Sequence, residues 1–218
     1  MKTIGNIKVL EFTDYAKNTK KYSNWRNSTN RFNNIKSSYY DTCIEKIKKE
    51  ENMEEYIDLY NDNKEKIGIV IPRSKEKELL EGQHILVSAL LVQNNENKIM
   101  MQLTSKSKGN ILSLPSGHVL HNENSKDTIV REIYEEQGIK IDKDEITLVE
   151  ERLANRIAFF DIYYLKADYN KEDMVLQDEE VADVIWMSPE DIFKEYDNGR
   201  VRKSSLESIK NFLNRNEL

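Results

Sequence analysis

Residues 117–139 read GHVLHNENSKDTIVREIYEEQGI, a stretch that carries seven ionised side chains between two glycines. Residues 125–137 are expected to form a helix, because Ile129 and Ile133 lie one turn apart and give it an apolar stripe to bury. The stretch therefore combines a face that belongs in a core with a density of charge that belongs at a surface.

Three glutamates on the predicted helix, Glu132, Glu135 and Glu136, fall at i, i+3 and i+4, so they lie within an arc of about 100°. Like charges at this spacing cost about 0.2–0.5 kcal/mol per pair when exposed, and more when desolvated. Arg131 can pair with Glu135, but one guanidinium cannot neutralise all three carboxylates. A divalent ion such as Mg²⁺ or Mn²⁺ can, because both ions prefer carboxylate and carbonyl oxygens as ligands.

The flanking residues suit such a site. Gly138 is expected just past the helix end, where a positive φ is needed. Gly117 lets the backbone turn closely enough for its carbonyl to face a metal ion, and Glu123 can support the patch from the preceding loop. A glutamate triplet on a helix is by default a solvated charged face. The fixed spacing of the whole stretch is the feature that distinguishes a metal site from such a face.

That spacing resembles the Nudix box, GX5EX7REUXEEXGU, in which U is an aliphatic residue. Each fixed position is matched, by Gly117, Glu123, Arg131, Glu132, Ile133, Glu135, Glu136, Gly138 and Ile139. At average residue frequencies such a match arises by chance on the order of 10⁻⁹ times per starting point, or ~10-fold more often in a Glu-rich chain. One departure precedes the box: LPSG places Ser116 where many family members have a second glycine.

The resemblance extends beyond the box and implies a fold. EEVADVIWMSPEDI near the end is similar to the last strand and helix start of Nudix domains, and YIDLYNDNKEKIGIVIPR resembles the leading hairpin of a subgroup that includes relatives of isopentenyl diphosphate isomerase. The similarity covers roughly residues 55–215. The implied class is α+β, an α/β/α sandwich with a mixed central sheet, preceded by an N-terminal extension.

The resemblance also implies an activity: hydrolysis of a pyrophosphate bond in a nucleoside diphosphate linked to another group, with Mg²⁺ or Mn²⁺ as cofactor. Metal ions would neutralise the anionic bridge and lower the pKa of a bound water. By the same resemblance, the metal ligands would be Glu132, Glu135, Glu136 and the Gly117 carbonyl. Arg131 would orient Glu135, and Glu123 would support the site.

The general base and the substrate contacts are less narrowly defined. Family members place the base either in the box, which favours Glu132, or on a later loop, which favours Glu179 or Glu180. His118, Arg152 and Arg156 are candidate substrate-binding residues. Which nucleotide derivative is cleaved does not follow from these residues.

The elements expected around the box come from hydrophobic patterning and turn residues. Strands are predicted at residues 56–60, 67–71, 84–92, 98–103, 146–153, 157–166 and 181–187, and later helices at 189–195 and 204–215. Several strands, a helix, several strands and two helices fit a mixed sheet between helices better than a βαβ repeat. The resemblance implies that residues 55–218 form a Nudix hydrolase domain.

Residues 1–54 form an extension whose fold the sequence does not define. Within it, residues 15–40 carry six positive side chains and no negative one, interleaved with Tyr22, Trp25 and Phe32. Such a stretch is more often a solvated surface, but it favours RNA binding as an alternative role, with the Nudix domain acting as a sensor. The extension is expected either to cover the cleft or to form a homodimer interface.

Composition limits the location and the rival chemistry. The chain has a net charge of −6, one cysteine, Cys43, and no apolar run long enough to cross a bilayer, so a cytoplasmic protein without disulfides or membrane association is expected. An isomerase of the isopentenyl diphosphate type needs a catalytic cysteine ahead of the box. Cys43 lies too far upstream to supply this cysteine, so hydrolysis is favoured over isomerisation.

Overall fold

A computed structural model of the chain describes residues 2–4, 7–9 and 54–216. The chain divides into two compact units, Met1–Met53 and Glu54–Leu218. In the first unit, strands β1 (Lys2–Ile4) and β2 (Ile7–Val9) pair antiparallel. The basic stretch at 15–40 and Cys43 lie outside the described residues.

The second unit contains the expected succession of strands and helices. Its strands and α-helices are β3 (Tyr56–Tyr60), β4 (Lys66–Pro72), β5 (Ile85–Gln93), β6 (Ile99–Thr104), β7 (Leu112–Ser113), β8 (Ser116–His118), α3 (Ser125–Gln137), β9 (Thr147–Ala154), β10 (Ala158–Lys166), β11 (Val181–Met187), α4 (Pro189–Asp197) and α5 (Lys203–Asn216). Three 3₁₀ helices complete it: η3 (Arg73–Glu78), η4 (Lys106–Lys108) and η5 (Lys171–Asp173). No helix among the described residues is long and apolar enough to cross a bilayer.

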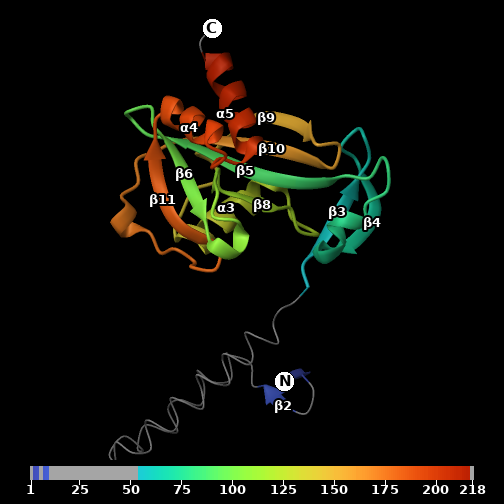
Figure 1. The fold of residues 1–218 in the computed structure, drawn as a ribbon. Helices are drawn as coiled ribbons and strands as arrows, with labels where there is room; N and C mark the ends of the chain where they lie inside the picture. The colour runs from blue at the N-terminus through green and yellow to red at the C-terminus, as the bar shows by residue number, and fades with distance from the viewer. Residues whose placement is uncertain (1, 5–6, 10–53, 217–218) are drawn as a thin grey trace, which may run out of the picture. The chain divides into compact units, whose positions relative to one another are not determined.

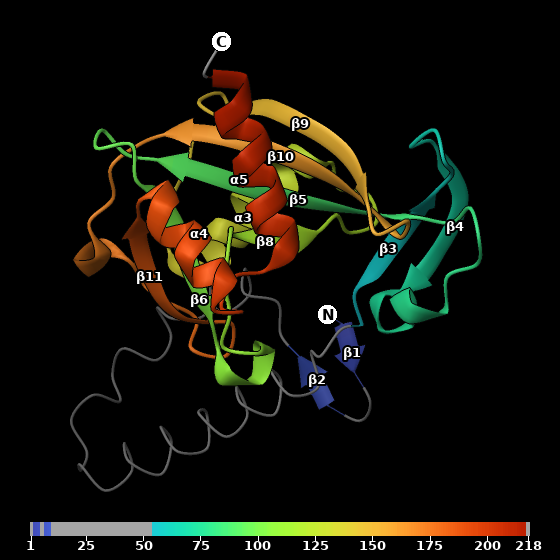
Figure 2. The same ribbon diagram turned by 45° about the horizontal axis from the view of Figure 1, so that its top comes forward.

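The central sheet is mixed and covered on both faces. Its strand order is β11-β6-β5-β10-β9, with β7 paired to β6 and β8 paired to β5. Strand β10 runs parallel to β5, whereas the other pairs in this sheet are antiparallel. Helix α3 lies on one face and α4 and α5 lie on the other (Figures 1 and 2). The predicted α/β/α sandwich is therefore confirmed.

Strand β5 lies at the centre of the sheet and contributes to the core on both sides. Leu90 and Val92 pack in the cluster that contains Ile129 and Ile133 of α3. Ala89 and Leu91 pack in the cluster beneath α4 and α5, which includes Ile192, Leu206 and Ile209. Burial of both faces explains why HILVSALLV is apolar at nearly every position rather than at alternate ones.

The β3–β4 hairpin forms a separate two-stranded sheet beside the start of β5. Ile57 and Leu59 pack against Ile85 and Val87, and the backbone of Tyr60 bonds to that of His84. Lys64, in the hairpin turn, forms ion pairs with Glu151 of β9 and Asp161 of β10. The hairpin is thus fixed to the sandwich, and with it η3, which follows directly.

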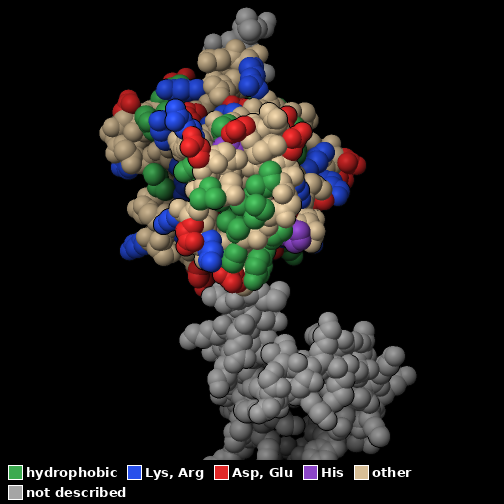
Figure 3. All heavy atoms as spheres, turned by 90° about the vertical axis from the view of Figure 1, so that its right-hand side faces the viewer, with side chains coloured by type: hydrophobic (Ala, Val, Ile, Leu, Met, Phe, Trp, Pro, Cys, Tyr) green, Lys and Arg blue, Asp and Glu red, His purple; other side chains and the backbone are tan. Residues whose placement is uncertain are grey.

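The β3–β4 hairpin exposes several apolar side chains. Ile67, Ile69 and Val70 of β4 are exposed, as is Tyr56 of β3, and Figure 3 shows hydrophobic side chains gathered on this side of the molecule. The contacts that hold the hairpin therefore come from its inner face and its turn.

Helix α3 has the ends that its sequence predicts. The Asn124 side chain accepts a hydrogen bond from the Asp127 amide at 2.9 Å, which caps the first turn. Gly138 has a φ of 71° and its amide bonds to the Tyr134 carbonyl, so the helix ends in a left-handed residue that glycine adopts without strain.

Candidate active site

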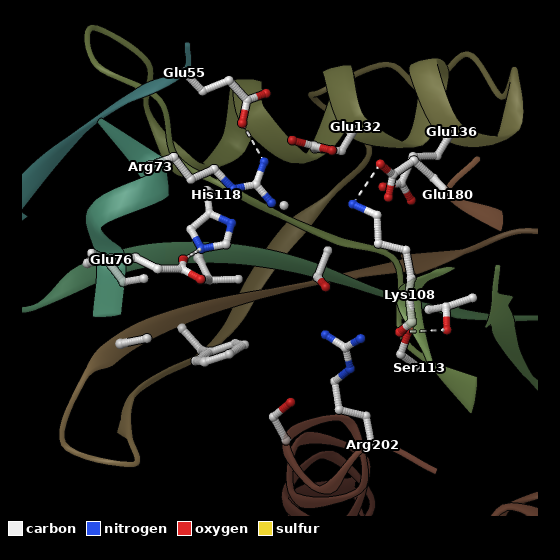
Figure 4. A pocket seen from close by; sticks show the side chains of 18 of the residues that line it. Glu55, Arg73, Glu76, Lys108, Ser113, His118, Glu132, Glu136, Glu180 and Arg202 are labelled. Atoms are coloured by element: carbon white, nitrogen blue, oxygen red, sulfur yellow. Dashed lines mark hydrogen bonds and ion pairs between the residues drawn. The ribbon is translucent and has the colours of Figure 1, made fainter. Parts of the chain in front are cut away.

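A cavity of about 520 Å³ opens between α3, η3 and the start of α5 (Figure 4). Glu132 and Glu136 project into it from α3, while Arg73, Glu76 and His118 lie at one end and Lys108 and Glu180 at the other. Strands β5 and β10 contribute an apolar portion of the wall, namely Ile85, Val87, Ala158 and Phe160. Acidic helix, cations and apolar wall thus converge on one hollow.

Position 117 requires glycine because the backbone there passes directly against the Glu132 side chain. Strand β8 pairs with β5, with Gly117 opposite Ser88. A Cβ added at Gly117 would lie 2.1 Å from the Glu132 side-chain carboxyl carbon, well inside contact distance. The motif glycine therefore leaves the space that this carboxylate occupies.

Glu136 is a buried acid with an unsatisfied oxygen. Its Oε2 is buried and has no hydrogen-bond partner among the described residues. Burial raises the pKa of Glu136 to about 7, and the nearby carboxylates of Glu132 and Glu180 add to the rise, opposed by a hydrogen bond from Gln102. Burial likewise raises the pKa of Glu132.

Arg131 links three of the acids. Its Nε and Nη2 donate to the two oxygens of Glu123 at 2.8 and 3.0 Å, a bidentate pair. Its Nη1 lies 3.0 Å from Glu132 Oε1 and 2.9 Å from Glu135 Oε2. Burial opposes ionisation of Glu123, but the hydrogen bonds from Arg131 and Thr128 hold its pKa below the usual value. Glu123 does not line the cavity, and its contacts are those of a group that positions Arg131.

The donors suit a hard divalent ion, although the carboxylates are not gathered around one point. No group of three or more His, Cys, Asp or Glu side chains within residues 54–216 is arranged to hold a metal ion. Glu132 and Glu135 are instead paired with Arg131. The oxygen-only donor set and the free Oε2 of Glu136 nevertheless fit Mg²⁺ or Mn²⁺.

The loop before β11 brings one of its predicted acids to the cavity. Glu180 lines the cavity, and its Oε1 lies 2.8 Å from Lys108 Nζ. Glu179 is exposed and absent from the lining, while its carbonyl accepts a hydrogen bond from Ser105 at 2.7 Å. Of the two later candidates for the base, Glu180 is the one near the acidic helix.

The three predicted substrate contacts differ in position. His118 lines the cavity, and its Nε2 lies 2.8 Å from Glu76 Oε2. Burial lowers the pKa of His118, and the charge of Arg73 lowers it further, against the opposing effect of Glu76. A largely neutral imidazole therefore faces the cavity at neutral pH.

Arg152 and Arg156 do not line the cavity. Arg152 donates to the Ser204 carbonyl at 2.9 Å and to Ser208 Oγ at 3.2 Å, so its guanidinium is directed to α5. It also lies 5.1 Å from the ring centroid of Phe160, which does line the cavity. Arg156 is exposed in the turn between β9 and β10 with a φ of 57°.

Several cavity residues were not predicted from the sequence. These are Glu55, Arg73, Glu76 and Lys77 from the hairpin region, Gln102 and Lys108 from β6 and η4, and Arg202 and Ser204 from the start of α5. One of them had a local signal, because Gln102 is a buried polar residue inside the apolar run IMMQL. Arg202 had none, since it lies in a short charged segment between two helices.

Comparison with known proteins agrees with this geometry. The NUDIX domain family model matches residues 82–208, more than half of the chain. Uncharacterized Nudix hydrolases of Listeria monocytogenes and Listeria innocua are each 31% identical, over 64% and 63% of this chain and 83% and 82% of their own lengths. The crystal structure of DR0079 from Deinococcus radiodurans superposes with a TM-score of 0.62 at 20% identity, over 72% of this chain and 98% of that one. Together with the acidic helix and its glycine, these matches show that the chain belongs to the Nudix hydrolase family.

Proposed function

We propose that the protein hydrolyses a pyrophosphate bond in a nucleoside diphosphate derivative, with Mg²⁺ or Mn²⁺ bound at the acidic face of α3. The observation that carries the proposal is the unpartnered, buried Oε2 of Glu136 in the same cavity as Glu132. A buried carboxyl oxygen without a partner costs free energy, and a cation is the partner that would recover it.

The residues of the site have separate proposed roles. Glu132, Glu135, Glu136 and the Gly117 carbonyl would hold the metal, which when bound neutralises the diphosphate and lowers the pKa of a coordinated water. Arg131 holds Glu135 and is itself held by Glu123, so the acidic face is fixed by hydrogen bonds on its outer side. The apolar wall around Phe160 would exclude water from the non-reacting part of the substrate.

Glu132 is the proposed general base. Its burial raises its pKa, which makes its carboxylate a better proton acceptor than an exposed glutamate. Glu180 is the alternative: Lys108 holds one of its oxygens, as Arg131 holds one oxygen of Glu132. Glu132→Gln should therefore reduce kcat by about 10²- to 10⁴-fold, and Glu180→Gln should have a smaller effect. The reverse order would assign the base to Glu180.

The activity itself is tested with a panel of nucleotide sugars, dinucleoside polyphosphates, nucleoside triphosphates and capped RNA, each with Mg²⁺, Mn²⁺ or EDTA. Wild-type protein should release phosphate or nucleotide only with a divalent ion. Glu136→Gln should lose this turnover by orders of magnitude while remaining folded. Full activity of that variant would show that the acidic face of α3 is not the site.

The remaining roles rest on other parts of the chain. RNA binding by the basic stretch, a homodimer formed through residues 1–54 and a cytoplasmic location stay predictions from the sequence. Binding to RNA through that stretch should weaken steeply between 50 and 200 mM salt, because it would depend on phosphate neutralisation.

A further inference from the structure

Arg202 is fixed at the cavity by the backbone on either side of it. Its amide donates to the Leu112 carbonyl at 2.8 Å, and the Leu112 amide donates to the Arg200 carbonyl at 2.8 Å. The segment thus pairs with β7, and Ser205 Oγ accepts a hydrogen bond from the Leu114 amide at 3.0 Å. Strand β7 lies only a few residues before Gly117. These hydrogen bonds therefore fix the start of α5 in position relative to the proposed metal site.

The side chain of Arg202 points into the cavity from the side opposite the acidic helix. Figure 4 shows its guanidinium directed from the start of α5 toward the hollow, facing the wall from which Glu132 and Glu136 project. Ser113 and Ser204 line the cavity as well and add polar groups to the same wall. A substrate held at α3 would therefore extend toward this arginine.

Most cations of the cavity are already neutralised. Arg73 pairs with Glu55, Lys108 with Glu180, and Arg131 with three glutamates. Within the part of the chain that the structure describes, neither Arg202 nor Lys77 has an ion pair or a side-chain hydrogen bond. Both residues are exposed, but Lys77 is a point charge on η3, whereas Arg202 presents a planar fork from a backbone fixed on both sides.

We propose that Arg202 binds a second anionic group of the substrate, a phosphate or carboxylate beyond the diphosphate that is cleaved. A guanidinium pairs with either group through two parallel hydrogen bonds. The ordinary alternative is a solvated surface arginine, but such a residue needs neither the paired backbone nor a place in the wall of the catalytic cavity. The proposal rests on the proposed function and narrows its substrates to diphosphates that carry a further negative charge.

Matched substrate pairs test the proposal and separate the two sources of charge. ATP and ADP differ by one phosphate, and UDP-glucuronate and UDP-glucose differ by one carboxylate. Wild-type protein should favour the more anionic member of at least one pair in kcat/KM. Arg202→Gln should remove that preference by raising KM about 10- to 100-fold for that member alone, with kcat nearly unchanged. Arg202→Lys should be intermediate, because it keeps the charge and loses the fork.

Lys203→Gln is the matched control, because it removes one positive charge from the neighbouring exposed residue, which does not line the cavity. It should leave each preference intact. If Lys203→Gln lost the preference for the more anionic substrate as fully as Arg202→Gln, the preference would depend only on the overall charge of the protein. That result would overturn the proposal.

A binding measurement makes the test independent of turnover. Calorimetric titration of the full chain with Mg²⁺ and inorganic triphosphate or diphosphate should show tighter binding of triphosphate, and Arg202→Gln should weaken triphosphate alone. Unchanged preferences in Arg202→Gln, in a protein that Glu136→Gln inactivates, would overturn this proposal and leave the proposed function standing. If the wild-type protein neither hydrolysed nor bound any of these compounds, both proposals would be overturned.

Discussion

Replacing Glu136 with glutamine should stabilise the metal-free protein. The pKa of this carboxyl is raised from 4.5 to about 7, mainly by burial, so between these pH values the folded state holds a proton that the unfolded state has released. Stability therefore falls as pH rises through this window. At 1.36 kcal/mol per pH unit, the full loss above pH 7 is about 3 kcal/mol. Glutamine has nearly the same shape and cannot ionise, so it avoids this loss.

Thermal unfolding in EDTA at pH 8 and pH 5 measures the effect. For a folded unit of this size, about 3 kcal/mol corresponds to a rise in Tm of roughly 6–12 °C at pH 8. At pH 5 the gain should fall below about 1 kcal/mol, because the wild-type carboxyl is then mostly protonated in the fold. Adding Mn²⁺ or Mg²⁺ at pH 8 should narrow the difference, since the ion stabilises wild-type protein by binding the folded state.

Glu135→Gln is the matched control on the same helix. Its side chain is 52% exposed and pairs with Arg131, so removing its charge should give no gain in stability. Both variants should lose activity, but only Glu136→Gln should gain Tm. A Glu136→Gln protein no more stable than wild type at pH 8 in EDTA, or one stabilised equally at pH 5, would refute the account of this carboxyl.

Three further substitutions separate positioning from folding. Gly117→Ala should fold with a Tm within a few degrees of wild type and lose about 100-fold in kcat, because the new methyl displaces the Glu132 side chain from its place beside the backbone. Unchanged kinetics would contradict that contact. Arg131→Lys should lower kcat about 10-fold or more with little loss of Tm, since lysine cannot make the bidentate pair with Glu123. A kcat equal to that of the wild type would show that the bidentate pair is dispensable. Arg152→Met should reduce the free energy of unfolding by about 3 kcal/mol, measured by urea denaturation, because it takes a hydrogen-bonded cation away from the buried carboxylate of Glu150. KM should stay unchanged; a raised KM with normal stability would restore a substrate contact.

The sequence identified those parts of the site that depend on local spacing. Residues 125–137 form the helix with the predicted limits, because its apolar stripe, its Asn124 cap and its terminal glycine all lie within a few turns of one another. The same local rule placed Glu132 and Glu136 on one face. Strands β7 and β8 were missed, since two or three residues are too few to show alternation.

Arg202 and Arg152 show what local spacing leaves open. Arg202 reaches the cavity through pairing between Leu112 and Val201, residues that lie far apart in the sequence, and no periodicity within its own segment predicts that pairing. Arg152 lies in a strand whose alternation was visible, but alternation does not say which face meets the cavity. The structure turns that side chain to α5, where a helix predicted in the right place supplies its partners.

The acidic face of α3 is tolerable because the helix does not depend on that face for its stability. A thirteen-residue helix is marginal by itself, and tertiary packing of its apolar stripe supplies most of what holds it. Ile129 and Ile133 are fully buried against β5, and burial of each contributes about 1.5–3 kcal/mol. That is comparable to the penalty carried by Glu136, so the core on one side of the helix can sustain an unpaired acid on the other. The apolar stripe and the proposed metal site are therefore two requirements on one element, and neither would be stable in this place without the packing that the sheet provides.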